Sequence, residues 1–441
     1  MFYIVESQDQ IDRLKGYANQ GAYVEVISSN DNYHPILTYT VAVYIRPLDS
    51  IEGFIIPINH TEGLNVDKDR VYELLKQFKT LYTYDKKHLL YHFVLPGVID
   101  ISLLNTMTNF DRKDLPKTNS TYNWFYNRMS EYKDLNAIIP IVKLYEKCED
   151  NYKHLDCILE YEIPEGFNFY NKTATNVFFM IERSGLKITY QSFLELFKPN
   201  NPVFSIQDNI IYTSYNLNNI TSRPTNAFNS VNFAAIPKAS NFKKAIVPQN
   251  GTFIAYDYDG YHLRLLCEQI GYTLTDESAH IQLARLYFKK EVITDEEYAN
   301  AKQINFQAIY GKIPPEYAFL EVFEKMERYT SLLWKQFKEQ GYVQDPISGK
   351  RFTQELPEMH PQKLLNYLMQ SLETSRNILI LKELLKYLEG KKTRIALYVY
   401  DAIIFDFSKE DGKETLEEIQ RIMESEGRYP TKVEYARSLD F

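Results

Sequence analysis

Cysteine is scarce in this chain, and its few copies exclude a secreted disulfide scaffold. Only Cys148, Cys157 and Cys267 occur among 441 residues, and no two of them have CxxC spacing. Three such cysteines cannot form a disulfide framework, and reduced thiols are typical of proteins inside cells. We therefore expect an intracellular, cytoplasmic protein. The length is sufficient for two or three domains with cores of their own.

Long apolar runs and a basic leader are also absent. No stretch approaches the roughly 20 apolar residues that a membrane helix needs. The opening segment, MFYIVESQDQ, has no basic segment followed by an apolar one, so we expect no signal peptide and no membrane partner. Hydrophobic residues form 44% of the chain and charged residues 24%, which indicates an ordinary globular protein.

Acidic residues are missing from one long stretch, although the whole chain has a net charge of −8. The negative total argues mildly against nucleic-acid binding. Between Asn209 and Tyr256, however, no Asp or Glu occurs, whereas Arg223, Lys243 and two further lysines do. The stretch is either a neutral loop rich in Asn and Ser or a surface that lies along phosphates. Charge alone favours neither interpretation.

The patterning divides the chain into two parts. Residues 21–29 and 53–60 resemble strands and residues 68–82 resemble an amphipathic helix, which indicates an α/β fold for the first part. The pattern breaks within residues 150–170, and we place the domain boundary after residue 155. The second part mixes strands and helices without βαβ alternation, as is typical of α+β folds.

Four segments of the second part have clear patterns. Residues 252–271 predict a strand that runs into a helix. Helices are predicted over residues 295–340, with a break at Pro314–Pro315, and over residues 360–388 as one long helix. Residues 393–408 predict a hairpin with a tight turn.

Two aspartates stand at the ends of these apolar strands. Asp257 follows the strand that begins at residue 252, and Asp401 lies in the hairpin turn. Each alone is most simply a turn residue. Side by side, the two carboxylates would repel each other and bind Mg²⁺, which takes one or two carboxylates and bridges substrate phosphates. Two such ions can activate an attacking hydroxyl and stabilise a leaving oxygen.

One predicted helix carries an unusual stripe. Lys302, Phe306 and Tyr310 recur at steps of four, and Gly311 follows directly. On a helix these side chains form a line about 12 Å long. An ammonium, a ring and a phenol in this order suit a nucleoside triphosphate, with its phosphates at Lys302 and its base at Tyr310. An amphipathic helix whose lysine reaches solvent explains the stripe equally well.

Taken together, these segments resemble the family A DNA polymerases, the group of bacterial DNA polymerase I and related phage replicases. The family's motif A, Asp-Tyr-Ser-x-x-Glu-Leu-Arg, is similar to DYDGYHLR at residues 257–264. Its motif B, Lys-x-x-x-Phe-x-x-x-Tyr-Gly, matches residues 302–311, and its motif C, Val-His-Asp-Glu, resembles VYDA at residues 399–402. Weaker matches, each in the family's order, are TSRPTNAFNSVNFAAIP (221–237), EQGYVQDPISGKR (339–351) and NYLMQ (366–370).

The resemblance, which begins at about residue 175, implies a right-hand polymerase fold. This fold has an α+β palm and fingers, and an α/β exonuclease-like (ribonuclease H-like) domain precedes it. The family has a long helical thumb where this chain has barely twenty residues, between ERSGLKITY and YTSYN, so we expect a rudimentary thumb. The expected layout is a degenerate 3′–5′ exonuclease-like domain (1–155) and a polymerase domain (156–441) with reduced thumb and connector (156–215), palm (216–275), fingers (276–345) and palm again (346–441).

Roles for single residues follow from the matched motifs. Asp257, Asp401 and the backbone carbonyl of Tyr258 would bind two Mg²⁺ ions, which Mn²⁺ can replace. Lys302 would contact the triphosphate and protonate the leaving pyrophosphate. The resemblance places nucleotide contacts at Tyr258, His262, His280, Lys302, Phe306 and Tyr310, and primer–template contacts at Arg223, Asn232, Lys243, Asn366, Gln370 and Tyr400.

The chain departs from the family at several positions. Tyr298 stands where the family has an Arg four residues before the motif B lysine, so one triphosphate cation is missing. His262 replaces the Glu that excludes a ribose 2′-OH, so discrimination against ribonucleotides is not assured. Ala402, Asp259 and Gln362 replace a Glu, a Ser and an Arg.

The exonuclease motifs of the first part are eroded. Editing uses two metal ions held by about four carboxylates, and one or two remain. We therefore expect a structural or DNA-holding remnant without nuclease activity. The aligned pairs are Glu25 and Ile27 for Asp-x-Glu, Asp85 and Leu89 for Asn-x-x-x-Asp, and Tyr132 and Asn136 for Tyr-x-x-x-Asp.

The leading hypothesis is primer-dependent, template-directed DNA synthesis, in DNA replication or in repair, in a bacterial or phage-infected cell. It implies primer–template DNA and dNTPs as partners, low processivity unless a processivity or replisome protein compensates, and no proofreading. A single-subunit RNA polymerase-like enzyme is an alternative because of His262. A catalytically silent primer–template-binding protein is another, because an Arg and a Glu of the motifs are lost.

Overall fold

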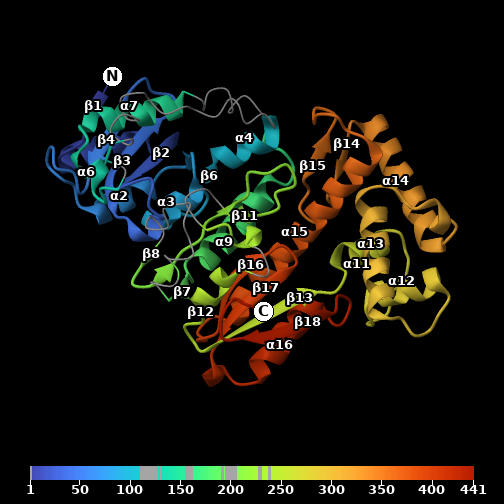
Figure 1. The fold of residues 1–441 in the computed structure, drawn as a ribbon. Helices are drawn as coiled ribbons and strands as arrows, with labels where there is room; N and C mark the ends of the chain where they lie inside the picture. The colour runs from blue at the N-terminus through green and yellow to red at the C-terminus, as the bar shows by residue number, and fades with distance from the viewer. Residues whose placement is uncertain are drawn as a thin grey trace. The chain divides into compact units, whose positions relative to one another are not determined.

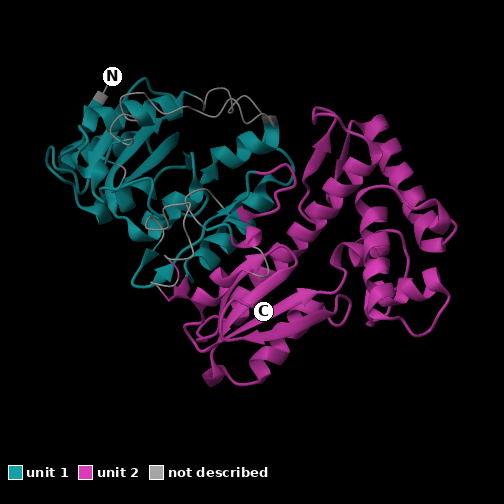
Figure 2. Cartoon of the chain, viewed as in Figure 1, with its two compact units in different colours: residues 1–185, 197–218, 226–232 teal, residues 186–196, 219–225, 233–441 magenta. Residues whose placement is uncertain are grey.

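The chain divides into two compact units, which Figure 2 distinguishes by colour. None of the described helices is long and apolar enough to cross a membrane. The chain first passes from unit 1 to unit 2 after Gly185. The domain boundary predicted after residue 155 is a different position and stays a prediction. Unit 1 comprises residues 1–185, 197–218 and 226–232, and unit 2 comprises residues 186–196, 219–225 and 233–441. The computed structural model describes residues 2–109, 128–129, 131–153, 162–189, 193, 206–226, 231–236 and 240–441.

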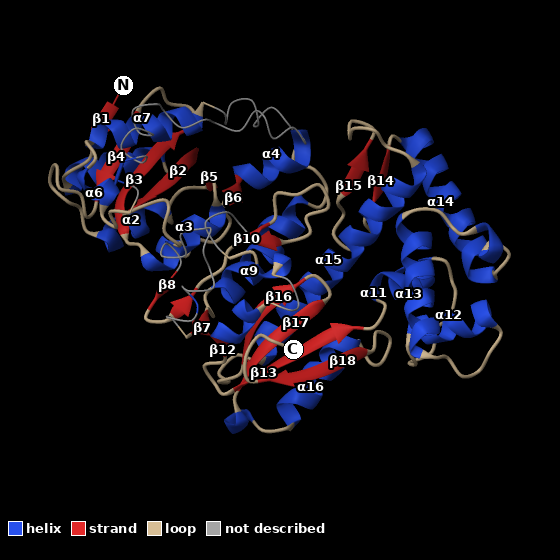
Figure 3. Cartoon of the chain, viewed as in Figure 1, coloured by secondary structure: helices blue, strands red, loops and turns tan. Residues whose placement is uncertain are grey.

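Unit 1 is built on a mixed sheet (Figures 1 and 3). The strand order is β1-β4-β3-β2-β5-β6, in which β3 runs antiparallel to both neighbours and the other pairs are parallel. The strands predicted at residues 21–29 and 53–60 are confirmed as β2 and β4. The bounds are β1 Phe2–Ile4, β2 Gly21–Ser28, β3 Thr40–Pro47, β4 Gly53–Pro57, β5 Thr80–Thr83 and β6 Ile99–Asp100.

The predicted helix over residues 68–82 is shorter than its pattern. It begins at Asp67, whose carboxylate accepts hydrogen bonds from two backbone amides, and it ends at Leu75. The last part of the pattern is strand β5 instead, because pairing with β2 outweighs the helical periodicity there. Val71, Leu74 and Phe78 are buried, as the apolar face of an amphipathic segment requires. The described helices are α1 Gln8–Leu14, α2 Lys68–Leu75, α3 Lys86–His92, α4 Ile101–Asn109, α6 Leu135–Ile138, α7 Ile141–Tyr152 and α9 Thr175–Glu182; short strands β8 Ile206–Gln207, β9 Ile210–Ile211 and β10 Tyr215–Asn216 follow, and β11 spans Thr225–Asn226.

Unit 2 is built on an antiparallel sheet of order β16-β17-β13-β18. The predicted strand-to-helix segment is confirmed as β13 followed by α11, and the predicted hairpin as β16 and β17. The strand bounds are β7 Leu186–Ile188, β12 Ile246–Val247, β13 Thr252–Tyr258, β14 Tyr342–Gln344, β15 Arg351–Thr353, β16 Arg394–Val399, β17 Ala402–Phe407 and β18 Thr431–Ala436.

A long helix, α15, organises the helices of unit 2 (Figure 1). It packs against α11, α13, α14 and α16. The break predicted at Pro314–Pro315 separates α13 from α14, and α13 begins with a capping box formed by Thr294 and Glu297. The helices are α11 Tyr261–Gln269, α12 Ala279–Phe288, α13 Asp295–Tyr310, α14 Glu321–Gln340, α15 Pro361–Tyr387 and α16 Glu414–Glu424.

Candidate active site

The two aspartates of the strand ends lie on neighbouring strands. Asp257 is the last but one residue of β13 and pairs in register with Ala402, the first residue of β17. The backbone amide of Tyr258 donates to the carbonyl of Asp401 over 3.2 Å. Strand pairing thus brings Asp257 and Asp401 to one end of the sheet, where both line a cavity of about 330 Å³.

The stripe of helix α13 lines the same cavity. Lys302, Phe306 and Tyr310 all face it. The Lys302 ammonium lies 5.8 Å from the centre of the Phe306 ring, and the Phe306 and Tyr310 rings stack with their centres 5.8 Å apart. Phe306 is 45% exposed, a large fraction for an apolar side chain. The stripe is therefore the exposed face of an amphipathic helix, as the alternative had it, and this exposed face borders the aspartates.

A chain of charged and polar groups closes one side of the cavity. His262 lies between the Tyr310 hydroxyl and the Glu373 carboxylate and hydrogen-bonds both. Glu373, from α15, is buried and also accepts a hydrogen bond from Arg223 over 3.0 Å. Burial favours the neutral acid, but the hydrogen bond from His262 and the charge of Arg223 outweigh it, so the pKa of Glu373 is lowered. Glu373 is thus a carboxylate held between two donors.

His280 and Tyr258 lie at the cavity with their side chains turned to protein partners. Burial lowers the pKa of His280 to about 4, so its ring is neutral at pH 7. The ring hydrogen-bonds Asn305 over 2.9 Å. The Tyr258 hydroxyl donates to the carbonyl of Met423, and its ring stacks on Tyr261. The Tyr258 side chain is therefore occupied within the protein, and its backbone carbonyl stays a predicted ligand.

Four of the six predicted primer–template residues lie near the cavity. Arg223 lines it, and its guanidinium sits 3.9 Å from the centre of the Tyr400 ring. Asn366 donates to the carbonyl of Tyr310 over 3.4 Å, and Gln370 accepts from Thr221 over 3.3 Å. The other two are not brought to this cavity. Lys243 lies on a short 3-10 turn of unit 2, and the exposed Asn232 belongs to unit 1.

Two of the departures from the family pattern have clear surroundings. Asp259 is buried, and its carboxylate accepts hydrogen bonds from the Ala279 amide over 2.9 Å and from Ser278 over 3.2 Å, at the start of α12. The Lys432 ammonium lies 3.0 Å from the Asp259 carboxylate and 3.4 Å from the Tyr298 hydroxyl.

A third departure has a smaller role. Gln362 donates its side-chain amide to the carbonyl of Ile309, near the C-terminal end of α13. It therefore supports the helix that carries the stripe.

Two residues of the cavity had no place in the sequence analysis. Glu373 continues the spacing of Asn366 and Gln370 by three more residues along α15, and this helical period could have indicated it. Lys432 belongs to no motif, and only the pairing of β18 with β13 brings it to the cavity.

The donor set suits divalent cations. Asp257 and Asp401 supply two carboxylates on adjacent strands, and the Tyr258 carbonyl follows in the chain. Burial and the nearby negative charge of Glu373 raise the pKa of Asp401. A bound cation would offset both effects, because it compensates the charge that these surroundings disfavour. The residues fit the Mg²⁺ site that the resemblance implied.

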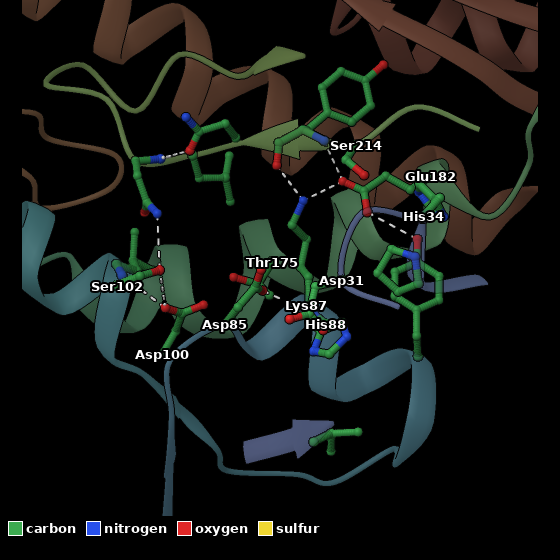
Figure 4. A pocket seen from close by; sticks show the side chains of 18 of the residues that line it. Asp31, His34, Asp85, Lys87, His88, Asp100, Ser102, Thr175, Glu182 and Ser214 are labelled. Carbon is green, nitrogen blue, oxygen red and sulfur yellow. Dashed lines mark hydrogen bonds and ion pairs between the residues drawn. The ribbon is translucent and has the colours of Figure 1, made fainter. Parts of the chain in front are cut away.

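Unit 1 has a cavity of its own, of about 440 Å³ (Figure 4). Charged side chains on its wall are paired within the protein. Lys87 contacts both the Glu182 carboxylate and the carbonyl of Tyr215. Burial and the negative charge of Asp85 raise the pKa of Asp100 to about 6, and Asp100 accepts a hydrogen bond from Ser102 over 2.9 Å.

The eroded exonuclease positions divide between this cavity and the core. Glu25 and Asp85 line the cavity, whereas Ile27 and Leu89 are fully buried apolar residues. Glu25 accepts hydrogen bonds from Tyr23 over 2.6 Å and from Asn151 over 2.9 Å.

The third aligned pair lies apart from the cavity wall. Tyr132 is 49% exposed, and the buried Asn136 donates to the carbonyl of Ser28 over 2.8 Å. Among the described residues, no group of three or more His, Cys, Asp or Glu side chains could hold a metal ion.

Comparison with known proteins agrees with the geometry of unit 2. No curated protein matches the sequence significantly. A solved structure of the POL domain of Pol1 from M. smegmatis, in complex with DNA primer-template and dNTP, has a TM-score of 0.69 at 15% identity, and the match covers 100% of this chain and 99% of that chain. It confirms the expected palm-and-fingers fold. The sequence model of DNA polymerase family A matches residues 184–440, more than half of the chain. The chain therefore belongs to DNA polymerase family A and is a DNA-directed DNA polymerase.

Proposed function

We propose that unit 2 extends a primer on a DNA template by two-metal nucleotidyl transfer from dNTPs. The observation that carries this proposal is the convergence of Asp257, Asp401 and the α13 stripe on one cavity. Carboxylates at the strand ends, and an ammonium followed by aromatic rings along α13, match the phosphate and base ends of a nucleotide. Family membership supports the DNA polymerase over both alternatives, the RNA polymerase-like enzyme and the silent binding protein.

The protein's residues act by binding, orienting and moving a proton. The primer 3′-oxygen attacks the α-phosphorus, the bond to the β-phosphate oxygen breaks, and pyrophosphate leaves. Lys302 holds the triphosphate and donates a proton to the leaving oxygen, while Phe306 and Tyr310 orient sugar and base. When bound at Asp257, Asp401 and the Tyr258 carbonyl, Mg²⁺ or Mn²⁺ would activate the attacking hydroxyl and stabilise the leaving oxygen.

Primer extension with a labelled primer–template tests this proposal. Asp257→Ala and Asp401→Ala should each abolish extension, because one carboxylate cannot hold two metal ions. Asp295→Ala is the matched control, since this exposed aspartate lies outside the cavity. Near-normal extension by either cavity variant, with the control also active, would refute the assignment.

We further propose that Arg223, Asn366, Gln370 and Tyr400 contact the primer–template. Arg223 lines the cavity, Tyr400 and Asn366 contact lining residues, and Gln370 lies one helical turn beyond Asn366 on α15. Asn232 and Lys243 remain proposals from the resemblance alone. Processivity is proposed to be low unless a processivity or replisome protein supplies the grip. The chain segment in which the family places its thumb lies largely outside the described residues, so sequence length is the support here.

Unit 1 is proposed to be an exonuclease-like domain without editing activity, in an intracellular protein of a bacterial or phage-infected cell. The match to the Pol1 structure covers the whole chain and so includes unit 1. The Lys147 ammonium contacts Asp31 and lies 4.0 Å from Glu25. The Lys147 ammonium therefore compensates the negative charge of these two carboxylates, which a metal ion would otherwise compensate.

A further inference from the structure

The cavity of unit 2 has a charge requirement that the motif residues do not meet. A dNTP brings a highly charged triphosphate, and metal ions offset only part of it. Among the described residues that line the cavity, the permanently positive side chains are Arg223, Lys302 and Lys432. Arg223 is engaged by Glu373 and by the Tyr400 ring, and His280 is neutral at pH 7. Lys302 and Lys432 are therefore the cations that can face phosphates.

Strand register places Lys432 beside the proposed metal site. In the antiparallel pair of β13 and β18, Lys432 lies directly opposite Asp257. Residues opposite each other in such a pair project from the same face of the sheet. The Lys432 side chain is 59% exposed, so its ammonium can reach a ligand in the cavity.

The Lys432 ammonium also lies where the motif B helix lacks a cation. Tyr298 stands one helical turn before Lys302 on α13. The Lys432 ammonium is 3.4 Å from the Tyr298 hydroxyl and 5.7 Å from the centre of its ring. The His280 ring contacts both Tyr298 and Phe306, and the charges of Lys302 and Lys432 both lower the pKa of His280. Both ammonium groups therefore lie near the neutral imidazole of His280.

The ion pair with Asp259 does not cancel the positive charge that Lys432 presents to the cavity. Asp259 is buried, with Arg264 3.8 Å away and two hydrogen bonds at the start of α12. Because Arg264 and the helix terminus also compensate the aspartate, the group as a whole keeps a positive charge toward the cavity.

We propose that Lys432 is a second triphosphate-binding cation of this polymerase, contacting the β- or γ-phosphate of the incoming dNTP. Asp259 and Tyr298 position its ammonium. The inference rests on the proposed function of the cavity. It identifies a substrate-binding residue outside the motifs, and it explains how Tyr298 is tolerated where a cation is expected.

Single-nucleotide incorporation kinetics test the proposal. Lys432→Gln should raise KM for dNTP about tenfold, the loss expected for one charge-assisted hydrogen bond, with a smaller change in kcat. The inhibition constant of inorganic tripolyphosphate with Mg²⁺ should rise by a similar factor. Lys413→Gln, which changes an exposed lysine outside the cavity, is the matched control and should leave both constants unchanged.

Two further variants separate phosphate binding from simple neutralisation of Asp259. Tyr298→Arg in the Lys432→Gln background should restore the KM, because it returns a cation to the same place. If Lys432 only neutralised Asp259, the Asp259→Asn, Lys432→Gln pair would have the wild-type KM, and this result would overturn the proposal. So would unchanged constants in Lys432→Gln.

The proposal and the function it rests on fail in different ways. A wild-type protein that does not extend primers would refute the proposed function. Direct binding of tripolyphosphate with Mg²⁺, measured by calorimetry on wild type and Lys432→Gln, then still decides the role of Lys432. Weaker binding by the variant supports the role, and equal binding refutes it.

Discussion

His262 shows how one replaced residue changes the expectation for sugar selectivity. The family's ribose-excluding Glu is absent from motif A, yet the His262 ring is fixed by Tyr310 on one side and by Glu373 on the other. A ring held at both nitrogens cannot easily move aside for a 2′-hydroxyl. Motif A has no carboxylate at this position, but the Glu373 carboxylate, on α15, hydrogen-bonds the His262 ring that stands there.

We predict that the enzyme prefers dNTPs over rNTPs and that His262→Ala weakens this preference by about 10- to 100-fold. The reason is that alanine removes the imidazole ring that would exclude a 2′-hydroxyl, whereas the proposed metal and phosphate contacts stay in place. Parallel measurements of kcat/KM for dNTP and rNTP on one primed template give the ratio. An unchanged ratio in the variant would show that another residue excludes the ribose.

Glu373 leads to a prediction on acid stability. Its folded pKa lies below the ordinary 4.5, so its contribution to stability is complete above about pH 4.5 and is lost as the pH falls through the folded value. At pH 7, Glu373→Gln should lower the free energy of unfolding by about 3 kcal/mol, since it leaves Arg223 without its partner. Denaturant unfolding without metal ions, at pH 7 and near pH 3.5, should show this difference shrinking in acid. A difference independent of pH would contradict it.

At the scale of elements, helix α13 combines a buried and an open face. Ala301, Ile304 and Ala308 are buried, whereas Lys302 and Phe306 are exposed to the cavity. The apolar side holds the helix in place, so the stripe is presented without a packing role of its own. This arrangement explains why the helix keeps an aromatic ring 45% exposed.

We predict that Phe306→Ala raises KM for dNTP about tenfold, the cost of losing one stacking surface. Its effect on stability should be small, because the ring is not part of the core. Gln307→Ala is the control, since it changes the next residue on the exposed side of the same helix. Single-nucleotide incorporation measures both variants, and equal effects of the two would argue that the stripe is not a binding face.

At the scale of the whole molecule, the short segment between ERSGLKITY and YTSYN leads to a prediction on processivity. About twenty residues cannot form the long helical thumb that grips a duplex, so each encounter should add few nucleotides. Primer extension with an excess of trap DNA measures the product length per encounter. Long products without an added partner protein would contradict the prediction.

Unit 1 leads to a prediction on editing, the removal of nucleotides from the 3′ end of the primer. We predict no metal-dependent degradation of a labelled 3′ end by the wild-type protein, because Lys147 neutralises Asp31 and Glu25 where metal ions would be needed. Incubation of single-stranded DNA with Mg²⁺ or Mn²⁺ tests this. Degradation that disappears in Glu25→Ala would overturn the prediction and restore an editing role to unit 1.

Much of the site could be predicted because its parts are local. Asp257 and Asp401 each end an apolar strand, and Lys302, Phe306 and Tyr310 follow a helical period, so local patterns mark them as candidates. The resemblance to the family's motifs was needed to choose the functional interpretation over a structural one. The helix predicted over residues 68–82 is too long, because helical periodicity is a local pattern and does not record pairing with a distant strand. The end of this segment pairs with β2 as strand β5 instead.

The remaining residues depend on contacts that no local pattern records. Glu373 meets His262 across 111 positions, and Lys432 meets Tyr298 across 134. Strand register and the packing of α15 bring these groups together, because side chains far apart in the chain meet only when sheet and helices assemble. The amino-acid order alone determined which groups are candidates for the chemistry, and the tertiary structure decided which further charges, those of Glu373 and Lys432, stand beside them.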